Sequence, residues 1–156
     1  MSLNFIQEEI LITGYGSDGS GIGKLRDGRV TFVQGVLPKE KALVKYPQTD
    51  KQFIKSRLVK IINPSPIRIE PKCAYFGKCA LCQFQFLAAD EQLAAKKSIL
   101  IDQFKRIGGV PNPESFLKPS ISSPAVYGYR RKMHFHIMPD GKFGLPSVNR
   151  KESITV

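Results

Sequence analysis

The first part of the chain alternates short apolar runs with turn signals. Runs rich in β-branched and aromatic residues occupy residues 10–12, 29–33, 42–46 and 53–62. Asp27-Gly28, between Leu25 and Val30, is a strong hairpin signal. We expect the glycine-rich stretch Gly14 to Gly23 to be a hairpin loop, because its glycines permit tight turns. Four to five short strands within residues 1–62 predict a small OB-like β-barrel, since closure removes exposed strand edges.

The pattern changes after residue 62. Asn63-Pro64-Ser65-Pro66 interrupts the strands, and we place a domain boundary there, dividing the chain into residues 1–62 and 63–156. A helix is then predicted from Ala88 to Ile107, because apolar residues recur at helical spacing. These are Leu93, Leu100, Phe104 and Ile107, joined by Ala94 and Ile101. Gly108-Gly109 ends this helix.

The last segment returns to a period of two. Tyr129, Arg131, Met133, Phe135 and Ile137 would share one face of a strand, opposite Arg130, Lys132, His134 and His136. Asp140-Gly141 then turns the chain into a second hairpin over residues 142–145. The predicted fold class is therefore mainly β with one helix (α+β), a small barrel followed by part of a central β-domain.

Charge narrows the classes of partner. The chain carries 24 lysines and arginines against 13 acidic residues, a net charge of +11. A chain this basic usually binds a polyanion, and nucleic acid is the first candidate for that partner. No basic amphipathic helix with a strong apolar face supports membrane binding, and no apolar run reaches the roughly 20 residues of a membrane span. Residues 1–9 lack a basic start and include Glu8 and Glu9, so we expect no secretory signal and a cytoplasmic location.

Basic residues are interleaved with aromatic ones in two places. The first patch is Lys51, Lys55, Arg57 and Lys60, close to Phe53. The second is Arg130, Arg131, Lys132 and Lys142, close to Tyr127 and Tyr129. Such interleaving suits single-stranded RNA, because charges follow the phosphates while rings stack on bases. The alternative is an ordinary solvated surface. Gly14 to Gly19 matches a dinucleotide-binding pattern, but the glycines that follow prevent a helix, so we exclude nucleotide binding.

Three cysteines are the strongest chemical signal. Cys73, Cys79 and Cys82 are all the cysteines present, and their spacing of five and two residues brings three thiolates within reach of one metal centre. Such centres want four ligands, so the site is one ligand short. Zinc could take His134 or His136 as the fourth, whereas an iron–sulfur cluster could take a cysteine beyond Val156. The spacing alone does not separate these alternatives from three buried thiols.

These motifs together resemble known families. Residues 11–60, with Gly21-Ile22-Gly23 and Asp27-Gly28-Arg29-Val30, resemble a TRAM domain, a small RNA-binding β-barrel. The run from Cys73 to Gln85 resembles the N-terminal part of bacterial RNA (uracil-5-)-methyltransferases of the 23S rRNA type. The resemblance continues, in order, through residues 92–93, 96–97, 106–109, 129–132, 141–144 and 150–153. Ala80-Leu81 departs from the family pattern, which commonly has two glycines there.

The resemblance implies a [4Fe-4S] cluster bound by Cys73, Cys79 and Cys82 with a fourth cysteine beyond Val156. It also implies an S-adenosylmethionine-binding domain beyond Val156, whose catalytic cysteine adds to a flipped-out uracil. We therefore expect no catalytic residue in this chain and no activity from it alone. The expected partner is RNA, with 23S rRNA first, and neither DNA nor a membrane. The alternatives are a transfer-RNA enzyme of the same family and a stand-alone zinc-stabilised RNA-binding module.

Overall fold

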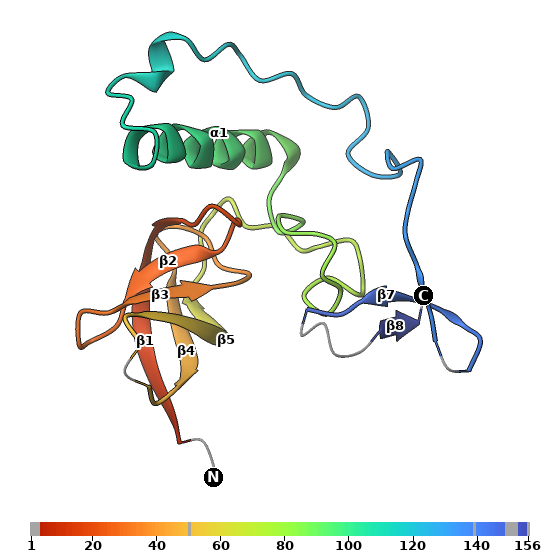
Figure 1. Cartoon of the computed structure of the whole chain (residues 1–156), viewed down its shortest axis with the longest axis horizontal. Helices are drawn as coiled ribbons and strands as arrows, with labels where there is room; N and C mark the ends of the chain where they lie inside the picture. The colour runs from red at the N-terminus through yellow and green to blue at the C-terminus, as the bar shows by residue number, and fades with distance from the viewer. Residues whose placement is uncertain (1–3, 50, 139, 149–152, 156) are drawn as a thin grey trace.

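The computed structural model describes residues 4–49, 51–138, 140–148 and 153–155. It is mainly β with one helix, so the predicted fold class is confirmed (Figure 1). Its N-terminal strands are β1 (Phe5–Tyr15), β2 (Gly21–Lys24), β3 (Val30–Val33), β4 (Lys41–Pro47) and β5 (Phe53–Asn63). They are followed by helix α1 (Ala89–Arg106), the 3₁₀ turn η1 (Pro113–Ser115), and strands β6 (His136–Ile137), β7 (Phe143–Pro146) and β8 (Ser153–Thr155).

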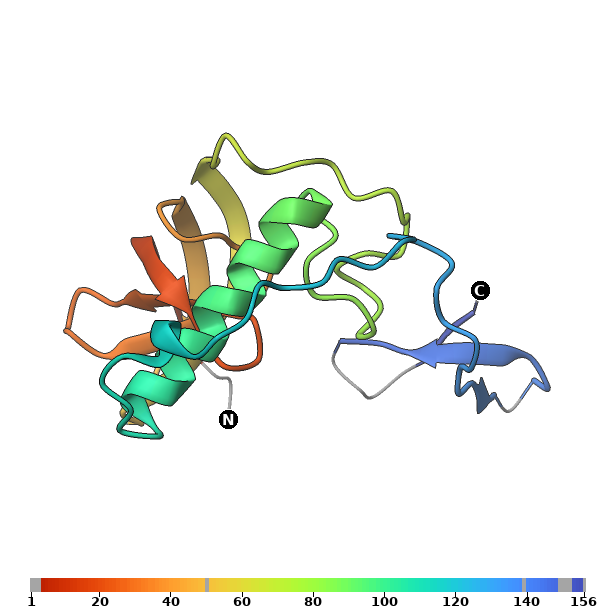
Figure 2. The same ribbon diagram turned by 90° about the horizontal axis from the view of Figure 1, so that it is seen from above.

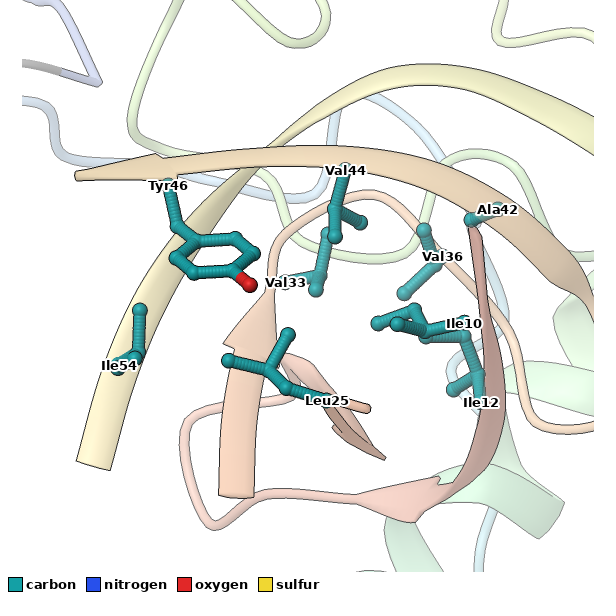
Figure 3. Packing of buried hydrophobic residues seen from close by; sticks show 9 residues of the cluster. All are labelled: Ile10, Ile12, Leu25, Val33, Val36, Ala42, Val44, Tyr46 and Ile54. Atoms are coloured by element: carbon teal, nitrogen blue, oxygen red, sulfur yellow. The ribbon is translucent and has the colours of Figure 1, made fainter. Parts of the chain in front are cut away.

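The first five strands form a closed barrel in the order β1-β2-β3-β5-β4. Neighbours are antiparallel except β3 and β5, which run parallel. Closure gathers one apolar core, since every second side chain of each strand points inward and is removed from water. Figure 3 shows this core, which consists of Ile10, Ile12, Leu25, Val33, Val36, Ala42, Val44, Tyr46 and Ile54. The predicted barrel is therefore confirmed.

Strand β2 corrects the expectation that residues 14–23 form a loop. The turn is confined to residues 16–20, and Gly21 and Gly23 are buried inside a strand. A Cβ on Gly21 would contact Val36 and lie 2.8 Å from Cγ2 of Ile12. Glycine is required at these positions because core side chains from neighbouring elements fill the space that a Cβ would occupy. A strand with glycines at its buried positions shows no alternating apolar pattern in the sequence.

Helix α1 has the predicted bounds to within a residue, but it packs through a different face. Ala95 is its buried residue and Ile99 packs beside it, whereas Leu100 and Ile107 are 41% and 78% exposed. Ala95 belongs to a second core with Leu37, Phe84, Phe86 and Leu87. This core joins the barrel to the segment that precedes the helix, and Figure 2 shows α1 lying across the barrel.

The predicted strand over residues 129–137 is wrong except at its end. Only His136 and Ile137 form β6, and residues 118–137 are exposed throughout (Figure 1). An alternating pattern needs a neighbouring strand to form a ladder, and β7 supplies one for those two residues alone. The second hairpin is confirmed, with Gly141 at φ 79° in its turn and β8 added beyond β7. Residues 150–152 of the family resemblance lie outside the described residues.

The boundary at residues 62–63 stays a prediction, although β5 does end at Asn63. In the part of the chain that the structure describes, no helix has the length and apolarity needed to cross a membrane.

Candidate functional site

The cysteine-bearing segment, residues 73–82, is a loop built from successive tight turns. The Phe76 amide donates to the Cys73 carbonyl at 3.0 Å, and the Cys79 amide donates to the Tyr75 carbonyl at 2.8 Å. Gly77 turns the chain at φ 80°, a value that glycine adopts without strain. All three cysteines are free thiols, with Cys79 buried, Cys73 half-buried and Cys82 exposed. We call these residues the cysteine loop.

Gln85 connects the two ends of the cysteine loop. Its Nε2 donates to Sγ of Cys82 at 3.2 Å, and its Oε1 accepts from the Cys73 amide at 3.3 Å. One amide side chain therefore holds the first and last cysteines in one locality. Nothing in the sequence marked Gln85 as functional apart from its place at the end of the family motif.

The donor chemistry of the loop suits a thiolate-bound metal, but its geometry is not assembled. Among the described residues, no three histidine, cysteine, aspartate or glutamate side chains are gathered so that they could hold a metal ion. This finding also goes against the zinc site with His134 or His136. Nδ1 of His136 lies 2.9 Å from the Ser153 hydroxyl, a contact with β8 and not with the cysteine loop.

The cysteine loop is anchored to the C-terminal sheet. The Ala80 amide donates to the Pro146 carbonyl at 2.9 Å, and the Val148 amide donates to the Lys78 carbonyl at 2.8 Å. Cys79 forms an isolated antiparallel bridge with Ser147. The loop thus extends β7 by strand-like pairing, and these amides are satisfied.

The second basic patch touches the same loop. The Arg130 guanidinium lies 3.4 Å from the Leu81 carbonyl, and the Lys72 ammonium lies 5.3 Å from the centre of the Tyr127 ring. Arg130, Arg131 and Lys132 are all exposed. Lys142 occupies the β6–β7 turn, where its ammonium pairs with Asp140 at 3.1 Å. That pairing reduces the charge which Lys142 offers to a partner.

The segment that follows the loop is anchored to the barrel. Gln83 Nε2 donates to the Asp18 carbonyl at 2.8 Å, and the Phe84 ring packs edge-on against Tyr15 at 5.9 Å. A Cβ on Gly19 would lie 2.8 Å from the Phe84 ring, so the turn over residues 16–20 is a surface on which Phe84 packs. This contact gives the glycine cluster a packing role that the sequence did not suggest.

A buried ion pair makes the second connection to the barrel. Glu40 has no exposed side chain, and Nε of Arg68 lies 2.7 Å from its carboxylate. Burial alone would raise the pKa of Glu40, but hydrogen bonds from Arg68, Ser65 and Leu37 outweigh it and hold that pKa below its usual value. Arg68 also donates to the Gly35 carbonyl and stacks over Phe86 at 4.7 Å.

The first basic patch lies on the outside of the barrel. Phe53, Lys55 and Arg57 alternate outward along β5, and all three are exposed. Lys51 precedes them in the loop and is exposed too. The structure adds two neighbours that the sequence analysis missed, Phe32 on β3 and Lys24 on β2. Their signal was weak, because the parallel pairing of β3 with β5 joins segments that are distant in the sequence.

The barrel has a counterpart among known families. Residues 6–59 match the family model of the TRAM domain, and this range covers nearly all five barrel strands. The barrel therefore resembles a TRAM domain along nearly its whole length. Most of the chain is also similar to bacterial 23S rRNA (uracil(1939)-C(5))-methyltransferases, as the motifs indicated.

Three relatives show the extent of this similarity, and each is named 23S rRNA (uracil(1939)-C(5))-methyltransferase RlmD. The protein of Alkalilimnicola ehrlichii is 40% identical over 124 residues, 80% of this chain and 27% of the relative. That of Stenotrophomonas maltophilia is 36% identical over 152 residues, 96% of this chain and 31% of the relative. That of Methylococcus capsulatus is 38% identical over 141 residues, 90% of this chain and 31% of the relative. The chain spans less than a third of the length of the curated relatives that it matches.

Proposed function

We propose that this chain is the RNA-binding N-terminal portion of an S-adenosylmethionine-dependent 23S rRNA (uracil-5-)-methyltransferase in the cytoplasm. The observation that carries the proposal is similarity of 36–40% identity over most of the chain to enzymes named for that reaction. A closed TRAM barrel with basic and aromatic side chains on its outer face supports it. The net charge of +11 supports RNA as the partner.

The RNA contacts would come from both basic patches. Lys51, Phe53, Lys55 and Arg57 would bind on the barrel, while Arg130, Arg131 and Lys132 would bind beside the cysteine loop, with a smaller share from Lys142. Arginine and lysine neutralise phosphates without reading sequence, so these residues would supply affinity and orientation. Methyl transfer would belong to the part of the relatives that this chain does not span, and none of its cysteines is assigned as nucleophile.

Direct binding tests the proposal. The purified chain should bind a single-stranded fragment of 23S rRNA more tightly than duplex DNA of equal length, measured by fluorescence anisotropy. The same preparation should transfer no methyl group from radiolabelled S-adenosylmethionine to that RNA. Equal affinity for the two nucleic acids would contradict the RNA-specific role, and detectable transfer would contradict the assignment of catalysis to another part.

We further propose that Cys73, Cys79 and Cys82 are ligands of a [4Fe-4S] cluster whose fourth ligand lies outside this chain. Three free thiols on one short loop and the family resemblance support it. The thiols would have to converge when the cluster binds, with Gln85 keeping Cys73 and Cys82 close. The cluster would supply a rigid cross-link between the loop and its neighbours.

Metal analysis of protein purified without oxygen distinguishes the two candidate metal centres. About four irons and four labile sulfides per chain would support the cluster. Stoichiometric zinc without sulfide would instead favour the stand-alone zinc-stabilised module. Replacing His134 and His136 together by alanine provides the control, because a cluster held by cysteines should not respond to it.

A further inference from the structure

We propose that Phe32 and Phe53 form a stacking platform for one unpaired base of bound RNA, flanked by Lys24 and Lys55. The inference rests on the proposed RNA-binding function and assigns it a specific site. Its ligand class is a nucleobase in single-stranded RNA together with the adjoining phosphates. The site lies where three strands of the barrel run side by side, on β2, β3 and β5 (Figure 1).

The register of these strands places the four side chains on one face. Lys24 is aligned with Val30, and Val30 with Phe53. In the next outward row, Ile22 is aligned with Phe32, and Phe32 with Lys55. The two rings therefore meet diagonally across β3 and β5, while the lysines occupy opposite corners of the patch.

The two rings form one apolar surface that water reaches. Their centroids are 6.5 Å apart with an interplanar angle of 54°, and Phe53 is 65% exposed. A tilted pair leaves the outer ring face open, and such a face can stack on any base. Phe5 provides the contrast on the same barrel, because the Lys45 ammonium lies 4.8 Å from the centre of its ring.

The charge around the rings suits a phosphate backbone. Lys24, Lys55 and Arg57 are exposed on neighbouring outward positions. Asp18 is the acid at the edge of the patch, where its carboxylate accepts from the Ser20 hydroxyl at 2.6 Å and from Gln34 at 3.3 Å. Burial opposes the ionisation of Asp18, but these Ser20 contacts and Lys55 hold its pKa low. The acid is thus already engaged by neighbours.

A peptide partner fits the patch less well than a nucleotide. Strand β3 is hydrogen-bonded on both sides, to β2 and to β5, along its whole length. An incoming strand would therefore find no free edge on β3, and a peptide lying over Phe32 could be held by side chains alone. In a nucleotide, the flat base could stack on the rings while the ammonium groups beside them contact the phosphates.

The test compares two oligonucleotides of equal charge on the whole chain. One is an oligouridylate of about ten nucleotides, within the span that one small barrel covers. The other has the same sugar–phosphate backbone without bases. The wild-type chain should bind the first more tightly, and Phe53→Ala should weaken that binding about five- to tenfold while leaving the abasic oligonucleotide unaffected.

Matched variants isolate stacking from charge and from folding. Phe53→Trp should retain base-dependent binding, and Phe5→Ala should leave binding to both oligonucleotides unchanged. Lys55→Gln should weaken both equally, since it removes a phosphate contact. Circular dichroism should show an intact barrel in every variant, because Phe53 is a surface side chain.

Two results would overturn the inference in distinguishable ways. Unchanged binding by Phe53→Ala, or equal weakening with both oligonucleotides, would mean that the rings do not stack on a base. In that case RNA binding itself would still stand. Failure of the wild-type chain to bind either oligonucleotide would overturn the proposed RNA-binding function together with this site.

Discussion

Glu40 connects a single residue to the arrangement of the whole N-terminal half. Its carboxylate accepts hydrogen bonds from the Leu37 amide at 2.7 Å, the Ser65 amide at 3.0 Å and the Arg68 guanidinium. Without the buried carboxylate, each of these donors would be left without a hydrogen-bond acceptor. Arg68 lies beyond the barrel strands, so the pair fixes the segment after β5 against the barrel.

Removing this carboxylate should destabilise the protein strongly. Glu40→Ala leaves the largely buried Arg68 unpaired and two amides without an acceptor, so we expect a loss of about 3 kcal/mol in the free energy of unfolding. Urea denaturation monitored by circular dichroism measures it. Lys41→Ala is the control, because it removes an exposed partner of Glu9 and should change little. Similar losses in both variants would contradict the assigned role of Glu40.

Glu40 should also make the fold sensitive to acid. Its pKa is lower in the folded chain than the ordinary value of 4.5. Its stabilisation is therefore complete above that value and is lost as the pH falls through the folded pKa. Unfolding free energies of the wild type and of Glu40→Gln should differ above about pH 4.5 and converge as the pH falls from there through the folded pKa. A constant difference between the two proteins across that range would show that Glu40 does not titrate with folding.

Strand β2 depends on glycine at its buried positions. Gly21→Ala should cost about 1–3 kcal/mol, because its Cβ would press against Val36 and Ile12 in a packed core. Gly14→Ala is the matched control on the neighbouring strand β1, where a Cβ would meet no atom within 4 Å. Thermal unfolding of the two variants makes the comparison. If both melt alike, the close approach at Gly21 does not constrain the barrel.

The elements differ in how far the sequence could predict them. Alternation around Ile54 and Lys55 marks both faces of β5, so this strand and its basic patch could be predicted. Strand β2 could not, because its glycines carry no apolar pattern. The alternation over residues 129–137 predicted the wrong structure, since a pattern identifies a face but cannot supply the partner strand.

The candidate site was predictable in its residues and not in its arrangement. The cysteine spacing marked the loop, but nothing local showed that Ala80 and Val148 would pair it with the C-terminal sheet. Phe32 was missed for the same reason, since its neighbour Phe53 comes from a strand distant in the sequence. Contacts of this kind depend on chain topology, which a periodic pattern does not encode.

Across the whole molecule, the cysteine loop is the junction between three parts. It pairs with β7, contacts Arg130 of the second basic patch, and continues into Gln83 and Phe84, which dock on the barrel. A ligand that tightened this loop would therefore restrain both basic patches relative to each other. The proposed cluster would then have a structural role in RNA binding, without any redox step.

The salt dependence of binding tests whether both basic patches contact the RNA phosphates. If about five phosphates are contacted on a single strand, the logarithm of the binding constant should fall with the logarithm of salt concentration at a slope of roughly −3.5. Removing charge at Lys55, Arg57, Arg130 or Lys132 should each flatten that slope, because one fewer counterion is released on binding. Lys96 and Lys97 are exposed on α1 outside both patches, so their replacement by glutamine provides the control. If the helix variants flatten the slope as much as the patch variants, binding follows net charge alone and the patches are ordinary solvated surface.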